Sequence, residues 1–112
     1  MTTTIIAESD RAIIGALAEC VEACSACAYR CGFGHEEMVA CGRLCADCAS
    51  VCELVHALLS RESPWAAPIA RVAMKVSIEC AAEGEKHDDE YCRACVPVCR
   101  AAAKHLQELV ER

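Results

Sequence analysis

Cysteine is the residue type in this sequence whose number and spacing indicate chemistry. The chain has 12 cysteines among its 112 residues, and all but Cys80 fall into three groups in which steps of four and three residues alternate. The groups are Cys20, Cys24, Cys27 and Cys31; Cys41, Cys45, Cys48 and Cys52; and Cys92, Cys95 and Cys99. Steps that average about 3.5 residues place every sulfur of a group on one face of a helix.

The same helical rows continue with aliphatic residues. The continuing positions are Ile13 and Leu17 before Cys20, Val55 and Leu59 after Cys52, and Leu106 and Leu109 after Cys99. Free cysteine behaves as a small buried hydrophobe, and packing alone explains one or two such residues. Leucine would fill a core better and would not oxidise. Cysteine in register along whole helix faces therefore favours metal binding.

The elements that must position these rows are four helices joined by short connections. Their expected ranges are about 9–31, 35–60, 63–86 and 88–110. Gly32 and Gly34 suit the end of the first helix, and Ser63 with Pro64 suits the start of the third. Short connections make consecutive helices antiparallel neighbours. We therefore expect an all-α fold, with residues 1–112 forming a single domain: an antiparallel up-down-up-down four-helix bundle with a cysteine-lined core.

Composition narrows the class of protein further. The net charge of −6 argues against a nucleic-acid partner. The longest run without Asp, Glu, Lys or Arg has eight residues, whereas a membrane-spanning helix needs about 20. The N-terminal segment lacks the basic start and apolar run of a secretory signal. We therefore expect no membrane association and a cytoplasmic location, where reducing conditions favour metal binding or redox chemistry over a disulfide scaffold.

Thiolate ligands restrict the identity of the metal. Sites made only of thiolates select Cu(I), Zn(II) or iron–sulfur clusters. The iron–sulfur run C-x2-C-x2-C-x3-C-P does not match, because the first gap of both four-cysteine groups has three residues and no proline follows them. Zinc takes four tetrahedral ligands, commonly from C-x2-C pairs in turns. Cu(I) needs two or three soft ligands, so each C-x3-C pair on a helix face can hold an ion.

Charge sets the expected metal load. Unpaired thiolates are very costly to bury, and a monovalent ion bridged between thiolates supplies one positive charge per sulfur. We expect several Cu(I) ions per chain, between about six and 12. Two alternatives stay open: a structural zinc-binding bundle that needs its metal to fold, and an iron–sulfur or thiol redox carrier. A catalytic Ser/His/Asp set or a glycine-rich phosphate loop is lacking, and we expect no enzymatic activity.

With these residues in view, the chain resembles the cysteine-rich four-helix-bundle copper storage proteins. The resemblance rests on the repeated C-x3-C-x2-C-x3-C groups, on CGRLCADCASVC at 41–52, on CAAEGEKH at 80–87 and on CRACVPVC at 92–99. It implies a bundle that stores Cu(I) on core thiolates and keeps copper from harming the cell, with the 12 cysteines as ligands. Family members without a signal peptide are cytosolic. Tetramers are usual in the family, so the resemblance implies that this chain forms a homo-oligomer. It also implies copper ions as the ligand of the protein.

Two helices depart from the family pattern. The third would carry its own 4-3-4 group, but the matching positions hold Ala73, Ser77, Cys80 and Gly84. The fourth has Ala102 and Leu106 where the pattern would continue. We therefore expect a lower storage capacity than in a relative with the full pattern, with most of the metal against the first and second helices. The cysteines expected to form sites that span all four helices are Cys31, Cys41, Cys80 and Cys92, towards one end of the bundle.

Four further side chains have the chemistry of accessory metal ligands. His35 and His56 each lie four residues beyond a cysteine, and His87 lies inside the stretch that carries the family resemblance. In an antiparallel bundle, Met38 shares one end with His35 and His87. Histidines in such places are more often surface or end-cap residues, and His87 is the preferred exception.

The remaining charged and aromatic residues are interpreted as structural. Glu37, Glu83 and Glu85 are expected on solvated helix faces. Trp65 and Phe33 are expected to plug the ends of the bundle.

Overall fold

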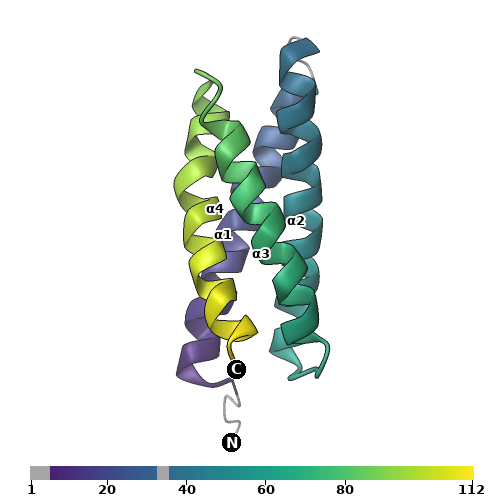
Figure 1. Ribbon diagram of the computed structural model, residues 1–112, viewed down its shortest axis with the longest axis vertical. Coiled ribbons are helices and arrows are strands. Elements are labelled where there is room, and N and C mark those ends of the chain that lie inside the picture. Colours follow the sequence, from purple (N-terminus) through teal and green to yellow (C-terminus); the bar gives the residue numbers. More distant parts are fainter. Residues whose placement is uncertain (1–5, 33–35) are drawn as a thin grey trace, which may run out of the picture.

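The computed structural model describes residues 6–32 and 36–112. Within these residues the chain forms four long α-helices and a short 3-10 helix, η1, which precedes the second of them (Figure 1). The helices are α1 (Glu8–Cys31), α2 (Val39–Ser60), α3 (Ala66–Gly84) and α4 (Glu90–Val110), and η1 is Glu36–Met38. They run alternately up and down, as the sequence predicts.

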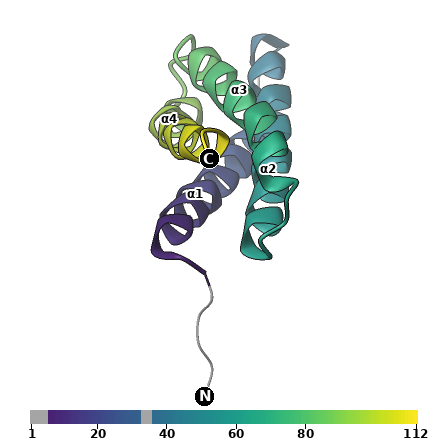
Figure 2. The same ribbon diagram turned by 60° about the horizontal axis from the view of Figure 1, so that its bottom comes forward.

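Each helix packs against two neighbours around a common axis. α1 packs on α2 and α4, and α3 packs on the same two helices from the other side (Figure 2). The bundle is elongated, measuring 51 × 29 × 18 Å along its principal axes. The expected antiparallel four-helix bundle is confirmed.

Helix starts differ from the sequence prediction by a few residues. α2 begins at Val39, after η1, and His35 lies outside the described residues. α3 begins at Ala66, because the Ser63 hydroxyl accepts a hydrogen bond from the backbone N–H of Trp65 at 3.2 Å and so caps a turn before the helix. α4 begins at Glu90, and Asp89 caps it, since its carboxylate accepts hydrogen bonds from the N–H groups of Tyr91 and Cys92.

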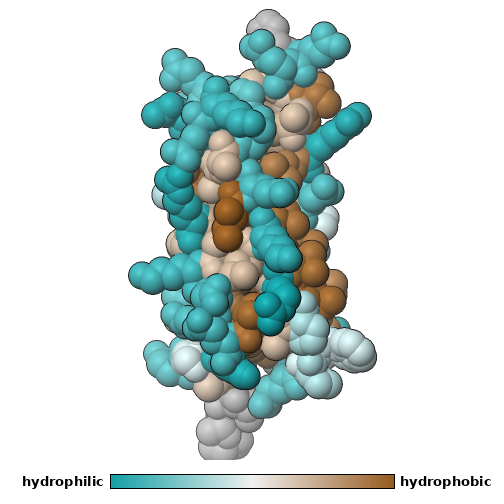
Figure 3. All heavy atoms as spheres, in the orientation of Figure 1, coloured by the Kyte–Doolittle hydropathy of each residue, from teal (hydrophilic) through white to brown (hydrophobic). Residues whose placement is uncertain are grey.

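One end of the core is hydrocarbon. The buried aliphatic residues there are Ile13, Leu17, Val55, Leu59, Leu106 and Leu109, all predicted from the helical rows. Small side chains of α3, Ala70 and Ala73, complete this layer. Trp65 does not plug this end, because its side chain is 66% exposed, and Phe33 lies outside the described residues. Hydrophilic side chains cover most of the face in Figure 3, with apolar patches along its middle.

α1 is long and apolar enough to cross a membrane by those two criteria alone. This is weak support for a membrane span, because the core helix of a bundle meets the same criteria. The buried residues of α1, including Leu17 and Cys24, pack inside the bundle. Glu19 and Glu22 lie on its exposed face.

Candidate metal centre

All 12 cysteines point into the bundle as free thiols. None of them is more than 4% exposed, the value for Cys31. The alternating steps of four and three residues produce this result, because they keep each sulfur on the buried stripe of its helix. Beyond the hydrocarbon end, the core therefore has thiols at positions where an ordinary bundle has leucine.

The sulfurs lie in a column along the bundle axis, and their contacts form two clusters. Near the end that holds the α1–α2 and α3–α4 connections, Cys41 Sγ lies 3.3 Å from Cys92 Sγ. Deeper in the core, Cys45 Sγ lies 3.6 Å from Cys80 Sγ. Thiols at these separations make weak hydrogen bonds to one another, and a metal ion between them would touch sulfurs from different helices.

Three groups of thiols lie close enough together to share metal ions. Within each group the sulfur atoms are all within 4.8 Å of one another. The groups are Cys20, Cys24, Cys48 and Cys99; Cys27, Cys31, Cys41 and Cys92; and Cys24, Cys45 and Cys95. Each group draws on α1, α2 and α4. The first and third groups share Cys24, so these two sites are not separate from each other, whereas the second group shares no cysteine with them.

The structure corrects the expected position of Cys80. The sequence predicts that it lies with Cys31, Cys41 and Cys92 in sites that span all four helices. Cys92 does contact Cys31 and Cys41, but Cys80 lies one level deeper, 4.0 Å from Cys24 Sγ and 3.6 Å from Cys45 Sγ. The cause is the position of Cys80 within α3, four residues before Gly84, which takes the level of Cys92.

The small residues of α3 have separate structural consequences. A β-carbon added at Gly84 would lie 2.9 Å from the Cys92 carbonyl oxygen and 2.9 Å from Val96 Cγ2. Glycine at this position therefore lets α3 and α4 approach closely. Ser77 is fully buried, and its hydroxyl lies 3.5 Å from Cys48 Sγ and 3.7 Å from Cys52 Sγ.

Burial and mutual hydrogen bonding move the pKa values of these thiols in opposite directions. Loss of water raises the pKa of Cys41 and of Cys92, because a thiolate is poorly solvated in the core. Hydrogen bonding with Cys24 lowers the pKa of Cys20 to about 5 and that of Cys80 to about 5. The same bonding, chiefly with Cys20, raises the pKa of Cys24. Hydrogen bonding therefore favours the thiolate form of the thiols that accept, such as Cys20 and Cys80. The thiols that donate, such as Cys24, keep their protons until a soft cation displaces them.

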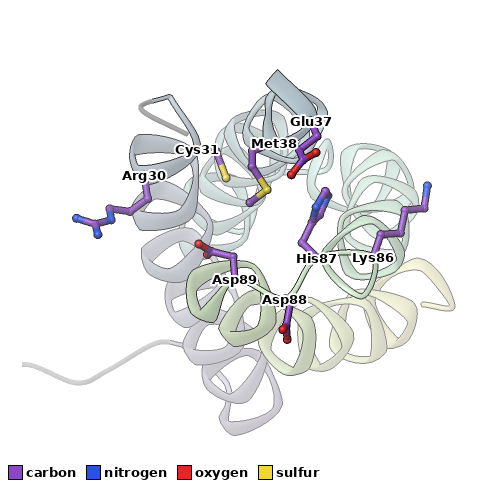
Figure 4. A pocket seen from close by; sticks show the side chains of 8 residues that line it. All are labelled: Arg30, Cys31, Glu37, Met38, Lys86, His87, Asp88 and Asp89. Atoms are coloured by element: carbon purple, nitrogen blue, oxygen red, sulfur yellow. The ribbon is translucent and has the colours of Figure 1, made fainter. Parts of the chain in front are cut away.

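The column opens at one end into a polar cavity. The cavity has a volume of about 590 Å³. Its lining residues are Arg30, Cys31, Glu37, Met38, Lys86, His87, Asp88 and Asp89. Cys31, Met38 and His87 point toward the middle of the opening, whereas Arg30 and Lys86 point away from it (Figure 4). We call this cavity the mouth.

A carboxylate orients the histidine of the mouth. His87 Nε2 lies 2.8 Å from Glu83 Oε2, and hydrogen bonding with His87 is the main cause that lowers the pKa of Glu83. This leaves the other ring nitrogen without that hydrogen bond, in the arrangement that histidine ligands commonly have. Glu83 is therefore not simply a solvated residue. Glu85 is exposed, as predicted, and pairs with Arg100 of α4.

The other proposed accessory ligands differ in position. Met38 shares the mouth with His87, as predicted. His56 is half-buried beside the cysteine row of α2, which continues through the buried Val55, and it belongs to none of the three thiol groups. Its role as a ligand stays a prediction. The four-residue spacing of Glu83 and His87 was the sequence signal for their pairing, although α3 ends at Gly84 and His87 lies just beyond it.

Fold and site together define a class of protein: a helical bundle whose core is a column of free thiols, closed by hydrocarbon at one end and open at the other. A sequence model described as copper storage protein matches residues 6–111. The chain therefore belongs to the copper storage protein family.

Individual relatives agree with this assignment. The cysteine-rich protein YhjQ of Bacillus subtilis (strain 168), whose function is uncharacterized, is 30% identical over 103 residues, which are 88% of this chain and 93% of that protein. The Cu(I)-bound copper storage protein BsCsp3 superposes with a TM-score of 0.86 at 27% identity, covering 92% of this chain and 99% of the other. A cytosolic copper storage protein from Streptomyces lividans with five coppers gives a TM-score of 0.85 at 29% identity, covering 94% of each chain.

Proposed function

We propose that this protein stores several Cu(I) ions on the thiolates of its 12 cysteines. The observation that carries the proposal is the column of buried sulfurs along the bundle axis, which form two clusters with contacts of 3.3 to 4.0 Å. Cu(I) is satisfied by two or three soft ligands. Neighbouring ions can therefore share the sulfurs of one column, which a set of separate tetrahedral sites cannot do.

Charge supports Cu(I) over zinc for this column. A zinc ion held by four thiolates leaves two uncompensated negative charges in the core, whereas one Cu(I) per thiolate leaves none. Only two of the thiol groups contain four sulfurs. A zinc protein of this structure would bind about two ions, and the copper-bound relatives favour Cu(I).

The mouth is the proposed route of copper to the column. Cys31 belongs both to the mouth and to the thiol group with Cys27, Cys41 and Cys92. His87 and Met38 offer a nitrogen and a thioether sulfur beside it, so an arriving ion meets ligands before it reaches the core. The hydrocarbon layer of Leu17 and its neighbours closes the opposite end.

Family membership implies storage rather than catalysis. We propose a cytoplasmic location, supported by the cytosolic relative from Streptomyces lividans and by thiols that stay reduced in that compartment. We also propose a homo-oligomer, a tetramer by resemblance to the family. Light scattering of the purified chain tests this, and a monomer at micromolar concentration would contradict it.

The decisive experiment is an anaerobic titration of the fully reduced protein with Cu(I) against a chromophoric chelator, repeated with Zn(II). We expect between about six and 12 Cu(I) per chain, held against the chelator, and about two Zn(II) or fewer. Saturation at one or two Cu(I) would contradict storage. Iron–sulfur absorption in protein purified without oxygen would favour an electron carrier instead.

A further inference from the structure

Ser77 is a buried hydroxyl whose surroundings are sulfur. It lies on α3 with no exposed surface, at the boundary between the thiol column and the hydrocarbon layer that begins with Ala73. Its hydroxyl lies within hydrogen-bond distance of two thiols, Cys48 Sγ at 3.5 Å and Cys52 Sγ at 3.7 Å.

A serine inside a helix commonly bonds its own backbone four residues earlier. Among the described residues, the structure gives the Ser77 hydroxyl no such bond and no partner other than these two thiols. Burying a hydroxyl that has only weak partners costs free energy. In the metal-free protein, serine at position 77 therefore stabilises the fold little or no more than alanine would.

The contribution of the Ser77 hydroxyl increases when copper binds, because each thiol that binds Cu(I) releases its proton. A thiolate sulfur is a much better acceptor than a thiol, and a hydrogen bond to a charged acceptor is about twice as strong as a neutral one. The hydroxyl is also the oxygen donor within reach of these two sulfurs, which otherwise have thiols and hydrocarbon around them. Its bond to sulfur is therefore stronger in the loaded state.

The position of Cys52 makes this bond specific. Cys52 is fully buried but belongs to none of the three thiol groups, so its sulfur has fewer close thiol neighbours than those in the middle of the column. Cys48 belongs to the first group and reaches the same hydroxyl. The hydroxyl of Ser77 thus lies between Cys52, the last sulfur of the column, and Cys48 of the first thiol group.

We propose that Ser77 is a positioning residue for the deepest copper ion. Its hydroxyl donates a hydrogen bond to the thiolate of Cys48 or Cys52 and stabilises that thiolate against reprotonation and loss of copper. This inference rests on the proposed function, and it identifies which of the missing family cysteines has been replaced by a group that acts on copper.

The test is anaerobic Cu(I) titration of the full chain carrying Ser77→Ala, with graded chelator concentrations. We expect one or two ions to be released at chelator strengths roughly tenfold or more below those that release them from the parent protein. The other ions should be released as before. The melting temperature of the metal-free variant should be equal or higher, because a buried polar group has been removed.

Two comparisons separate this role from a packing role. Ser50→Ala, the same change at an exposed position of α2, should alter neither copper retention nor melting temperature. In a Cys48→Ala/Cys52→Ala background, Ser77→Ala should have no further effect on copper retention, as a double-mutant cycle requires. Ser77→Cys, which supplies a thiolate ligand, should restore tight retention.

The outcomes distinguish the two proposals. If the parent protein binds several Cu(I) and Ser77→Ala retains every ion equally well, the role of Ser77 is wrong and storage stands. A loss of copper from Ser77→Ala only in proportion to a lower melting temperature would also contradict the role of Ser77. If the parent protein itself binds no more than one or two ions, the proposed function fails.

Discussion

At the scale of single residues, cysteine serves this core in two ways. A neutral thiol packs as a small hydrophobe, so the metal-free core costs little to bury. The same side chain becomes a soft anionic ligand once its proton is displaced. Cys24 shows both properties, because its sulfur is fully buried and lies 3.5 Å from Cys99 Sγ in one potential metal site and within reach of Cys45 and Cys95 in another.

Gly84 provides a test of packing at the mouth end of α3. Gly84→Ala places a methyl group 2.9 Å from the backbone oxygen of Cys92, which cannot move without shifting α4. We expect the metal-free protein to lose about 1–3 kcal/mol of stability, measured by thermal or denaturant unfolding.

Gly15 is the matched control for Gly84. It lies in the exposed part of α1, and a β-carbon there meets nothing within 4 Å. Gly15→Ala should therefore stabilise the protein by about 0.5–1 kcal/mol through helix propensity. Equal effects of the two substitutions would show that α3 and α4 are not in close contact at Gly84.

His87 provides a test of the route to the column. His87→Ala should leave the final copper load unchanged but slow uptake from a Cu(I) chelate by at least about tenfold, the effect typical of losing even an outer-shell partner of a metal ligand. Stopped-flow absorbance of the released chelator measures the rate. His105→Ala, which alters a half-buried histidine of α4 outside the mouth, is the control, and equal rates for both variants would contradict a route through the mouth.

At the scale of helices, the contributions to the column are unequal. α1, α2 and α4 each supply a sulfur to every thiol group, whereas α3 supplies Cys80 alone and belongs to none of the three. α3 instead brings small residues to the axis, with Ala73 and Ser77 fully buried. Its role is to close the bundle around sulfurs that the other helices present.

Two quadruple substitutions measure this inequality. Replacing Cys24, Cys27, Cys45 and Cys48 by Ser removes two sulfurs from the first thiol group, one from the second and two from the third. Replacing Cys80, Cys92, Cys95 and Cys99 by Ser removes one from each group. The first variant should therefore lose much more bound copper than the second, by metal analysis after gel filtration. Equal losses in folded protein would contradict the unequal contribution.

The sequence predicts these helices well because a single period determines them. Steps of four and three residues specify both the helix and the face that carries the sulfur. The cysteine rows that end at Cys31 and at Cys52 can therefore be predicted from the spacing alone. Contacts between helices depend on axial register, which no local pattern encodes. The predicted position of Cys80 along the bundle axis is wrong for this reason. The exposure of Trp65 was not predicted either, because Ser63 caps a turn before α3 rather than the helix itself.

At the scale of the whole molecule, the hydrocarbon layer and neutral thiols should support the fold without metal. We expect the reduced, metal-free protein to be helical by far-ultraviolet circular dichroism. Copper should raise the melting temperature by mass action, because it binds the folded state preferentially. A random-coil spectrum for the metal-free protein would contradict this and favour a bundle that needs zinc to fold.

Proton release should couple copper binding to pH across the whole column. Burial raises the pKa of Cys41 and Cys92, so these thiols are protonated at neutral pH and each must lose a proton to bind Cu(I). Affinity should therefore fall as pH falls, by about tenfold per pH unit for each proton displaced per ion.

Cys20 and Cys80 should behave differently, because hydrogen bonding lowers the pKa of each to about 5. This hydrogen bonding favours their thiolate forms near neutral pH, so copper displaces fewer protons from them there than at lower pH. Proton release during anaerobic Cu(I) titration in weakly buffered solution should thus be smaller than the number of thiols at pH 7 and should increase toward pH 5. A release of one proton for every thiol, unchanged between these values, would show that all the thiols of the metal-free column hold their protons.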